Sequence, residues 1–467
     1  MRKRTVRVLT GVAVIVLALG LSYAIAVAIC AAKLRRAYAA LEKDGRPMRT
    51  ADILPPEVPD IENGALLYES AALLLKAEPV GHSLESRPGE SVPEAIEREK
   101  NKDLLGYLAG RSSIFAYGKL TPEKRQELEE LMSRKEVDCA LSSIENGTQR
   151  PSCRQHRDYD AGMNLLSPGL TDARSLADIV GAKARLEAEA GAMDRAWHLA
   201  VMQAKLADAY RSEPILISQL VRMRMIELSC QTVRRLCEIA QPGKEQQGHL
   251  ETILHAFDDV TPVVRAMDGD RLLSGEWFFT RSKQELLRDS ILNDDQMSRF
   301  MAWLMMKRLT FKPLFLADHA NYLRLMHEGT QSLERPYTRE TPREDYGFFS
   351  LTGMLTPGFG RVRTLYCQMA AETRITRAGL ALLQYRTAHE AFPATLGELN
   401  LDRLSDPFIQ GPLHYRAEGD GFIVYSVGED LKDNGGNPRR GNKQQTDYDL
   451  VWRFPAPQGP PSEKTSS

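Results

Sequence analysis

Residues Val8 to Ala32 read VLTGVAVIVLALGLSYAIAVAICAA, a run of 25 residues that carries no charge. About 20 apolar residues in a helix span the hydrocarbon core of a bilayer, so the run predicts one transmembrane helix. The alternative is a cleaved signal peptide, but the apolar core of such a peptide has only about 7–15 residues. No polar region follows the small-x-small triplets inside the run, which favours an uncleaved anchor. We therefore expect residues 1–36 to form a membrane anchor, with the lipid bilayer as its partner.

The basic residues on both sides of this run bear on its orientation. They are Arg2, Lys3, Arg4 and Arg7 before it, and Lys33, Arg35, Arg36, Lys43, Arg46 and Arg49 after it. Flanking charge alone favours a cytoplasmic C-terminal side, but long domains cross membranes largely regardless of such charges. We expect a single-pass protein of the inner (cytoplasmic) membrane, with its bulk outside the cytoplasm. In that compartment Cys139 and Cys153, which flank a predicted polar loop from Ser142 to Pro151, are candidates for a disulfide.

Composition limits the classes of function. The 467 residues include 61 Lys and Arg against 62 Asp and Glu, a formal net charge of −1. A nucleic-acid-binding protein needs a basic face, so this balance removes the electrostatic reason to expect one. With 43% hydrophobic and 26% charged residues, the chain is typical neither of disordered proteins nor of multi-span membrane proteins. Its length allows two or three hydrophobic cores.

Residues 37–360 are predicted to form a large α-helical domain. A proline-rich spacer runs from Leu54 to Pro59 and is expected to be stiff. The clearest helices extend from Leu176 to Tyr210 and from Pro214 to Ile239, and the wide apolar arc of the second indicates burial on more than one side. Further helices are expected at 249–267, 282–309 and 311–333. Because no known helical repeat period recurs, we expect an array of helical hairpins outside the repeat families.

A smaller α+β module is predicted at 361–454. One apolar stripe of a long helix is formed by Val362, Leu365, Met369, Thr376, Leu380 and Leu383. Strand patterns follow at 413–416, 422–426 and 449–454, with a Gly-Asp-Gly turn between the first two that predicts an antiparallel hairpin. Residues 455–467 are rich in proline and serine and are expected to be a disordered tail. The predicted fold class is therefore mainly α, with a transmembrane helix, a helical hairpin array and a small antiparallel sheet.

Several short motifs of this module occur in an informative order. They are Tyr385, Phe392-Pro393-Ala394-Thr395-Leu396, Asp406-Pro407-Phe408, Tyr415, Tyr425-Ser426-Val427-Gly428-Glu429-Asp430 and Asp449-Leu450-Val451-Trp452. In order and spacing, residues 367–454 resemble the soluble domain of the type II secretion major pseudopilin. The resemblance implies a helix packed on a small antiparallel sheet, with a calcium ion in the last loop.

Two departures from that family argue against a pilus subunit. Pseudopilins carry a prepilin-peptidase signal just before the apolar helix, and Arg4-Thr5-Val6-Arg7-Val8 lacks it. The membrane helix of the family also continues directly into the soluble helix, whereas about 330 residues separate the two here. A type II secretion or pilus-associated component is therefore an alternative function and not the expected one.

The resemblance nominates calcium ligands at Asp430, Asp433, Asp447 and Asp449. Calcium takes 6–8 oxygen ligands from a flexible loop, and the segment from Asp430 to Asn437 offers carboxylates, amides and glycines. The same loop contains the basic residues Arg439, Arg440 and Lys443, which offer another way to neutralise the acids. A solvated loop of Asx turns is the alternative to a calcium site.

The chain lacks the common catalytic motifs, including GxSxG, HExxH, Walker A and CxxC. Its richest polar cluster runs from Arg154 to Asp160, where His156 with Asp158 or Asp160 is a candidate acid–base group. A solvated loop between helices is the other interpretation of this cluster. We therefore expect a non-enzymatic scaffold or binding protein of the cell envelope with an unknown protein partner. An envelope hydrolase that uses His156 is the alternative from another functional class.

Overall fold

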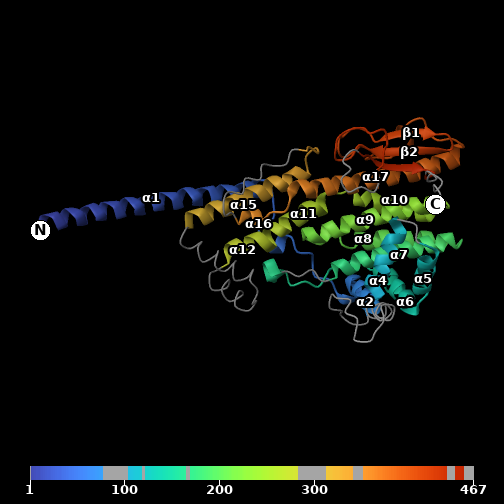
Figure 1. The fold of residues 1–467 in the computed structure, drawn as a ribbon, viewed down its shortest axis with the longest axis horizontal. Helices are drawn as coiled ribbons and strands as arrows, with labels where there is room; N and C mark the ends of the chain where they lie inside the picture. The colour runs from blue at the N-terminus through green and yellow to red at the C-terminus, as the bar shows by residue number, and fades with distance from the viewer. Residues whose placement is uncertain are drawn as a thin grey trace, which may run out of the picture.

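The computed structural model describes residues 2–76, 104–117, 121–164, 169–281, 312–339, 351–438 and 448–456. Within these ranges the chain is mainly helical and ends in a small antiparallel sheet, which confirms the predicted fold class. Figure 1 shows one helix projecting from an elongated body of packed helices, with the sheet lying along the last long helix.

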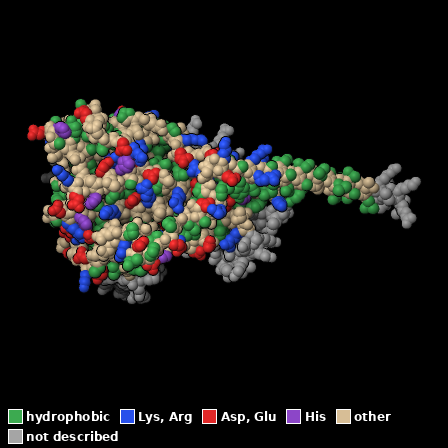
Figure 2. All heavy atoms as spheres, turned by 180° about the vertical axis from the view of Figure 1, so that it is seen from behind, with side chains coloured by type: hydrophobic (Ala, Val, Ile, Leu, Met, Phe, Trp, Pro, Cys, Tyr) green, Lys and Arg blue, Asp and Glu red, His purple; other side chains and the backbone are tan. Residues whose placement is uncertain are grey.

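The projecting helix is α1, Arg2–Lys43, and among the described helices it is the one long and apolar enough to cross a membrane. Its 42 residues rise by about 63 Å, roughly twice the thickness of a hydrocarbon core. Side chains from Val8 to Ile25 are exposed, and Figure 2 shows this part as a stalk covered by hydrophobic side chains. Burial begins at Ala26, and Leu41 is fully buried where α1 packs on α15.

The body is built from helices joined mostly by short connections. They are α2 (Ala65–Leu75), α4 (Leu104–Tyr117), α5 (Pro122–Met132), α6 (Lys135–Thr148), α7 (Leu170–Glu189), α8 (Met193–Asp208), α9 (Leu216–Cys237), α10 (Lys244–Phe257), α11 (Thr261–Asp270), α12 (Trp277–Thr280), α15 (Lys312–Leu333), α16 (Thr352–Leu355) and α17 (Phe359–His389). Short 3₁₀ turns occur at η1 (Thr50–Asp52), η2 (Asp60–Glu62), η3 (Tyr159–Asn164) and η5 (Leu396–Leu399), and η4 (Arg271–Glu276) is a π-helical turn.

The predicted single helix from Leu176 to Tyr210 is wrong, because the chain turns back near its middle. Gly191 has a φ of +88°, a left-handed conformation that glycine adopts without steric cost. The N–H of Ala192 donates to the carbonyl of Glu187 at 2.8 Å and closes the end of α7. The break makes α7 and α8 an antiparallel hairpin.

Two further expectations need correction. The predicted loop from Ser142 to Pro151 is mostly helix, because α6 continues to Thr148 and buries an apolar stripe that includes Ile144. The predicted helix at 249–267 is divided into α10 and α11, since Pro262 sits in the first turn of a new helix. The predicted helix at 282–309 lies outside the described residues.

The hairpin array has α7 packed against α8 and both packed against α9. The helix α17 lies on the other side of α9 and also contacts α10 and α15. One hydrophobic core runs without interruption from Leu41 through this array to Trp452 in the last strand. The sequence-based boundary between 360 and 361 therefore falls inside a continuous core.

The C-terminal sheet has three antiparallel strands in the order β1 (His414–Glu418), β2 (Gly421–Ser426) and β3 (Leu450–Phe454). The predicted hairpin is confirmed, with Glu418 opposite Gly421 at the turn. Every residue of the central strand β2 is buried. The face of the sheet toward the body packs on α17, where the indole of Trp452 covers Gly379.

Asp178 of α7 is a buried carboxylate whose surroundings do not compensate its charge. Its side chain is 5% exposed, and its nearest cation is the half-exposed Arg174, with Nε 3.8 Å from Oδ2. Among the described residues, its Oδ1 atom has no hydrogen-bond partner. Burial raises the pKa of this carboxyl to about 6. The ionised form of such a carboxyl is less favourable in the folded protein than in the unfolded chain, so folding is favoured while the group is protonated.

We expect Asp178→Asn to stabilise the protein at pH 8 by about 1–2 kcal/mol and to have little effect near pH 4. The pKa of Asp178 is higher in the folded protein than in the unfolded chain, so ionisation of this carboxyl opposes folding. The wild type therefore has its full stability below pH 4 and loses stability as the pH rises through 6. Asp178 lines a small pocket together with Gln203, whose buried Oε1 atom has no hydrogen-bond partner among the described residues. Urea unfolding of both proteins at the two pH values measures the difference, and an equal effect at both pH values would contradict the prediction.

Candidate functional site

The predicted acid–base cluster does not converge on a pocket. His156, Asp158 and Asp160 are exposed, and Oδ1 of Asp158 accepts a hydrogen bond from the backbone N–H of Asp160 at 3.1 Å. None of the three lines a cavity described below. The geometry therefore gives no support to the hydrolase alternative.

The arginines of the same cluster form ion pairs instead. Nε of Arg157 lies 2.7 Å from Oε2 of Glu213, and both side chains are 1% exposed. Nη1 of Arg154 lies 2.7 Å from Oε1 of Glu57, a residue of the proline-rich spacer. The cluster that looked catalytic in the sequence thus joins the loop after α6 to the spacer and to the turn between α8 and α9.

Three of the four predicted calcium ligands lie in the described part of the last loop, and their carboxylates accept hydrogen bonds from it. Asp430 accepts from the backbone N–H of Lys432 and from the amide of Asn434, at 3.0 Å each. Asp433 accepts from the backbone N–H of Gly435 at 2.8 Å and from the hydroxyl of Tyr425 in β2 at 3.0 Å. Asp449 accepts from three backbone N–H groups, those of residues 434, 436 and 437.

This arrangement is that of a loop organised by Asx turns. Within the described ranges, no group of three His, Cys, Asp or Glu side chains has a geometry suited to a metal ion. Asp447 lies outside those ranges. Calcium at Asp430, Asp433, Asp447 and Asp449 therefore stays a prediction.

The two cysteines considered for a disulfide are both free thiols in this structure. Cys139 is exposed on α6, whereas Cys153 is half-buried in the loop that follows α6. Burial raises the pKa of the Cys153 thiol to about 12, and the nearby carboxylates of Glu213 and Glu69 act in the same direction. Cys153 is therefore protonated at neutral pH and is a poor nucleophile.

A cavity of about 720 Å³ lies between the proline-rich spacer and the body. Its walls come from the spacer, from α2 and the end of α6, and from α8, α10 and α11. The volume is in the range of small-molecule sites, about 300–1,000 Å³. The cationic side chains that line it are Arg150, Arg154, Lys205, Arg211 and Arg265, and the acidic ones are Asp208 and Asp259. We call this space the basic cavity.

Arginine side chains hold the spacer in place as one wall of the basic cavity. Nε and Nη2 of Arg265 donate to the carbonyl of Ile53 at 3.1 and 2.6 Å. Nη1 of Arg150 donates to the carbonyl of Ile61 at 2.6 Å. Together with Arg154 on Glu57, these contacts fix both ends and the middle of a segment that proline already stiffens.

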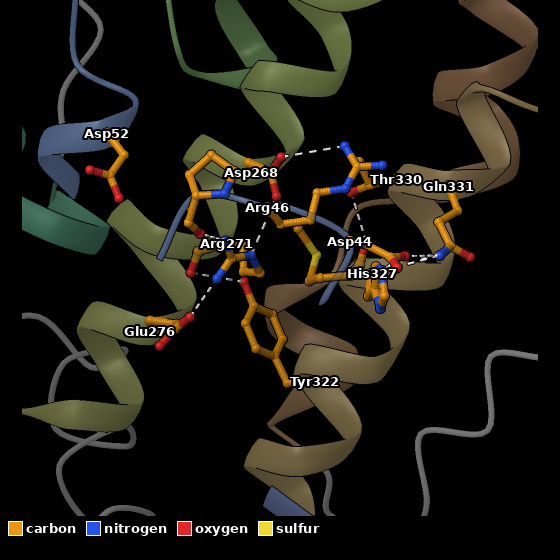
Figure 3. A network of polar contacts seen from close by, with 12 residues as sticks. Asp44, Arg46, Asp52, Asp268, Arg271, Glu276, Tyr322, His327, Thr330 and Gln331 are labelled. Carbon is orange, nitrogen blue, oxygen red and sulfur yellow. Dashed lines mark hydrogen bonds and ion pairs between the residues drawn. The ribbon is translucent and has the colours of Figure 1, made fainter. Parts of the chain in front are cut away.

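A second polar assembly lies where α1 enters the body, and we call it the anchor junction (Figure 3). Its centre is Arg271, which is 1% exposed at the start of the π-helical turn η4. Nη1 of Arg271 lies 2.6 Å from Oε1 of Glu276 at the other end of that turn, and Nε lies 3.5 Å from Oδ1 of Asp268. A further N–H of Arg271 donates to the carbonyl of Pro47, just beyond α1.

Side chains at the C-terminal end of α1 complete the junction. The hydroxyl of Tyr38 donates to Oε2 of Glu276 at 2.8 Å. Oδ2 of Asp44 lies 2.8 Å from Nε2 of His327, and this bond is the largest cause that lowers the pKa of the Asp44 carboxyl. Nη2 of Arg46, just past the end of α1, lies 2.7 Å from Oε2 of Glu334.

No local pattern in the sequence predicts either assembly. The anchor junction draws on 38–47, 268–276 and 327–334, and the basic cavity on five separate segments. The signal that could have indicated them is the presence of charged residues within apolar helices. Lys, Arg, Asp and Glu are almost never fully buried unless paired, so such residues indicate ion pairs. Which charges pair depends on how distant segments pack.

Comparisons with protein-family models, with curated proteins and with solved structures find no match to this chain. The resemblance of residues 367–454 to pseudopilins therefore stays a prediction from the short motifs of the sequence.

Proposed function

We propose that this chain is a single-pass inner-membrane protein that acts as a non-enzymatic scaffold or binding protein. The observation that carries the proposal is the continuity of α1, which runs as one helix from the uncharged segment into the anchor junction. About 20 residues suffice for the bilayer, so the remaining turns of α1 are available for docking on the body. The body is then held in a fixed orientation to the membrane.

The packing of α1 on α15 supports a rigid connection. The hydroxyl of Tyr38 lies 3.4 Å from Nε2 of His319. Asp44 contacts His327, which lies about two turns further along α15. The two helices therefore run parallel, side by side, over about two turns (Figure 1). A flexible tether would not need such paired contacts. A fixed orientation is useful for presenting a binding surface to a protein partner.

Membrane fractionation tests the anchor. We expect the full chain to stay in the membrane pellet after an alkaline carbonate wash and to require detergent for release. A variant that lacks residues 2–36 keeps Tyr38 and the rest of the junction and should enter the aqueous fraction. Full-length protein recovered from the aqueous fraction without detergent would contradict the proposal.

The exposed thiol of Cys139 tests the orientation. After mild reduction, a membrane-impermeant maleimide should label this residue in intact spheroplasts if the body lies outside the cytoplasm. Cys139→Ser is the matched control and should remove the label, because the other described thiols are half-buried or buried. Labelling that appears only after the cells are lysed would place the body in the cytoplasm.

A further inference from the structure

The basic cavity has more positive charge than its own acids neutralise. Asp259 pairs with Arg211, and Oδ1 of Asp208 lies 3.1 Å from Nη2 of Arg222, a buried arginine behind the wall. Arg154 pairs with Glu57. The two acids that line the cavity are therefore already paired with arginines and leave the other cations of the wall uncompensated.

Three cations of the wall have no carboxylate partner among the described residues: Arg150, Lys205 and Arg265. Arg150 and Arg265 use some of their N–H groups on the carbonyls of Ile61 and Ile53, which flank the spacer, but a carbonyl does not cancel a full charge. Guanidinium groups have five donors each, so donors remain for a ligand. Lys205, in the last turn of α8, is a half-buried residue of the cavity wall.

Like charges that surround one concave space attract anions strongly. Low-dielectric walls focus the field and raise the local concentration of a counter-ion. Arginine and lysine side chains are the usual partners of phosphate, which arginine can bind through two parallel hydrogen bonds. A phosphate monoester carries a charge of about −1.5 to −2 at neutral pH, which suits a wall with three uncompensated cations.

The cavity is also larger than a phosphate group. Its wall includes apolar surface from Tyr68, Ile253, Pro262 and the prolines of the spacer. Ligand sites commonly combine such surface with a few convergent polar groups. The body of the ligand would lie against this surface, while the anionic group faces the cations.

We propose that the basic cavity binds a small phosphorylated molecule, through Arg150, Lys205 and Arg265, with the organic part against Tyr68, Ile253 and Pro262. This site is independent of the anchor and adds a ligand to the proposed scaffold function. The shared chemistry is a phosphate ester, which either a soluble metabolite or an anionic lipid headgroup can supply.

Calorimetric titration of the full chain in phosphatidylcholine nanodiscs tests the proposal, with sodium pyrophosphate and glycerol phosphate as probes at low ionic strength. We expect saturable binding with a Kd below about 1 mM that weakens as chloride is added. Lys205→Gln should weaken binding about tenfold, since it removes one charged hydrogen bond. Lys205 does not hold the spacer, so this variant leaves the wall of the cavity in place.

Lys135→Gln is the matched control, because Lys135 is an exposed lysine on α6 away from the cavity. It should change the Kd by less than about twofold. Nanodiscs that contain phosphatidic acid distinguish the two sources, since a bound lipid headgroup would compete with the soluble probes. Linear, non-saturating heats up to about 10 mM probe, or equal affinity for wild type and Lys205→Gln, would overturn the proposal.

Discussion

Replacing Arg271 with alanine is expected to lower the free energy of unfolding by about 3–5 kcal/mol. The guanidinium of this residue is 1% exposed and lies between Asp268 and Glu276. Burial raises the pKa of both carboxyls even with Arg271 present. Without the arginine, Glu276 would lose its cation and Asp268 would keep only Arg46, whose Nη1 lies 3.7 Å from Oδ2. The carbonyl of Pro47 would also lose its donor.

Denaturant unfolding of the full chain in detergent measures this effect. Arg324→Ala is the matched control, because Arg324 is 45% exposed and pairs with Glu328 one turn away on α15. Exposed pairs of this kind contribute about 0–1 kcal/mol. A loss for Arg271→Ala no greater than that of the control would mean that the anchor junction does not stabilise the fold.

A second variant separates lost charge compensation from lost packing. Arg271→Met combined with Glu276→Gln removes the cation and one acid but keeps most of the side-chain volume. We expect this double variant to recover a substantial part of the stability lost in Arg271→Ala, because buried ion pairs often contribute little more than neutral groups of the same shape. The rate of limited proteolysis near Pro47 should rank the variants in the same order as their loss of stability, since this residue connects α1 to the body.

The sequence predicted those elements whose pattern is local. The uncharged run from Val8 to Ala32 predicts α1, and the Gly-Asp-Gly turn before Phe422 predicts the hairpin of β1 and β2. The break at Gly191 was missed because the apolar positions on both sides of it fit one continuous helix. Local periodicity does not distinguish a long helix from two helices joined by a tight turn.

The two candidate sites could not be predicted in the same way. Arg271 and Pro47 are more than 200 positions apart, and their contact depends on how α11 and η4 pack beside α1. Likewise, Arg265 meets Ile53 only because the spacer folds back over α11. His156 drew notice through its neighbours in the sequence, but the loop turns that side chain to solvent. Neighbours in sequence are thus a weak guide to convergence in space.

The close approach of α17 to the sheet gives a prediction in which two effects oppose each other. Gly379 lies inside α17, where alanine has a helix propensity more favourable by up to about 1 kcal/mol. A Cβ atom at this position would lie 1.9 Å from Cζ3 of Trp452, whose side chain is buried. Overpacking of a core costs about 1–3 kcal/mol and sometimes more. We expect the steric cost to win, so that Gly379→Ala destabilises the protein by about 2–3 kcal/mol.

The sign of this effect should depend on the indole of Trp452. Trp452→Leu alone is expected to cost about 2–4 kcal/mol through lost contacts with Phe422 and α17. In that background the obstacle is gone, so adding Gly379→Ala should be neutral or slightly stabilising. A double-mutant cycle by denaturant unfolding then gives a coupling energy of about 2 kcal/mol or more.

Gly248 of α10 provides the control for helix propensity, because nothing lies within 4 Å of the Cβ position there. Gly248→Ala should stabilise the protein by up to about 1 kcal/mol in both backgrounds. If Gly379→Ala behaved like Gly248→Ala in the wild-type background, α17 and the sheet would not be in the tight contact described. A destabilisation that persists unchanged in Trp452→Leu would instead place the steric conflict with a neighbour other than the indole.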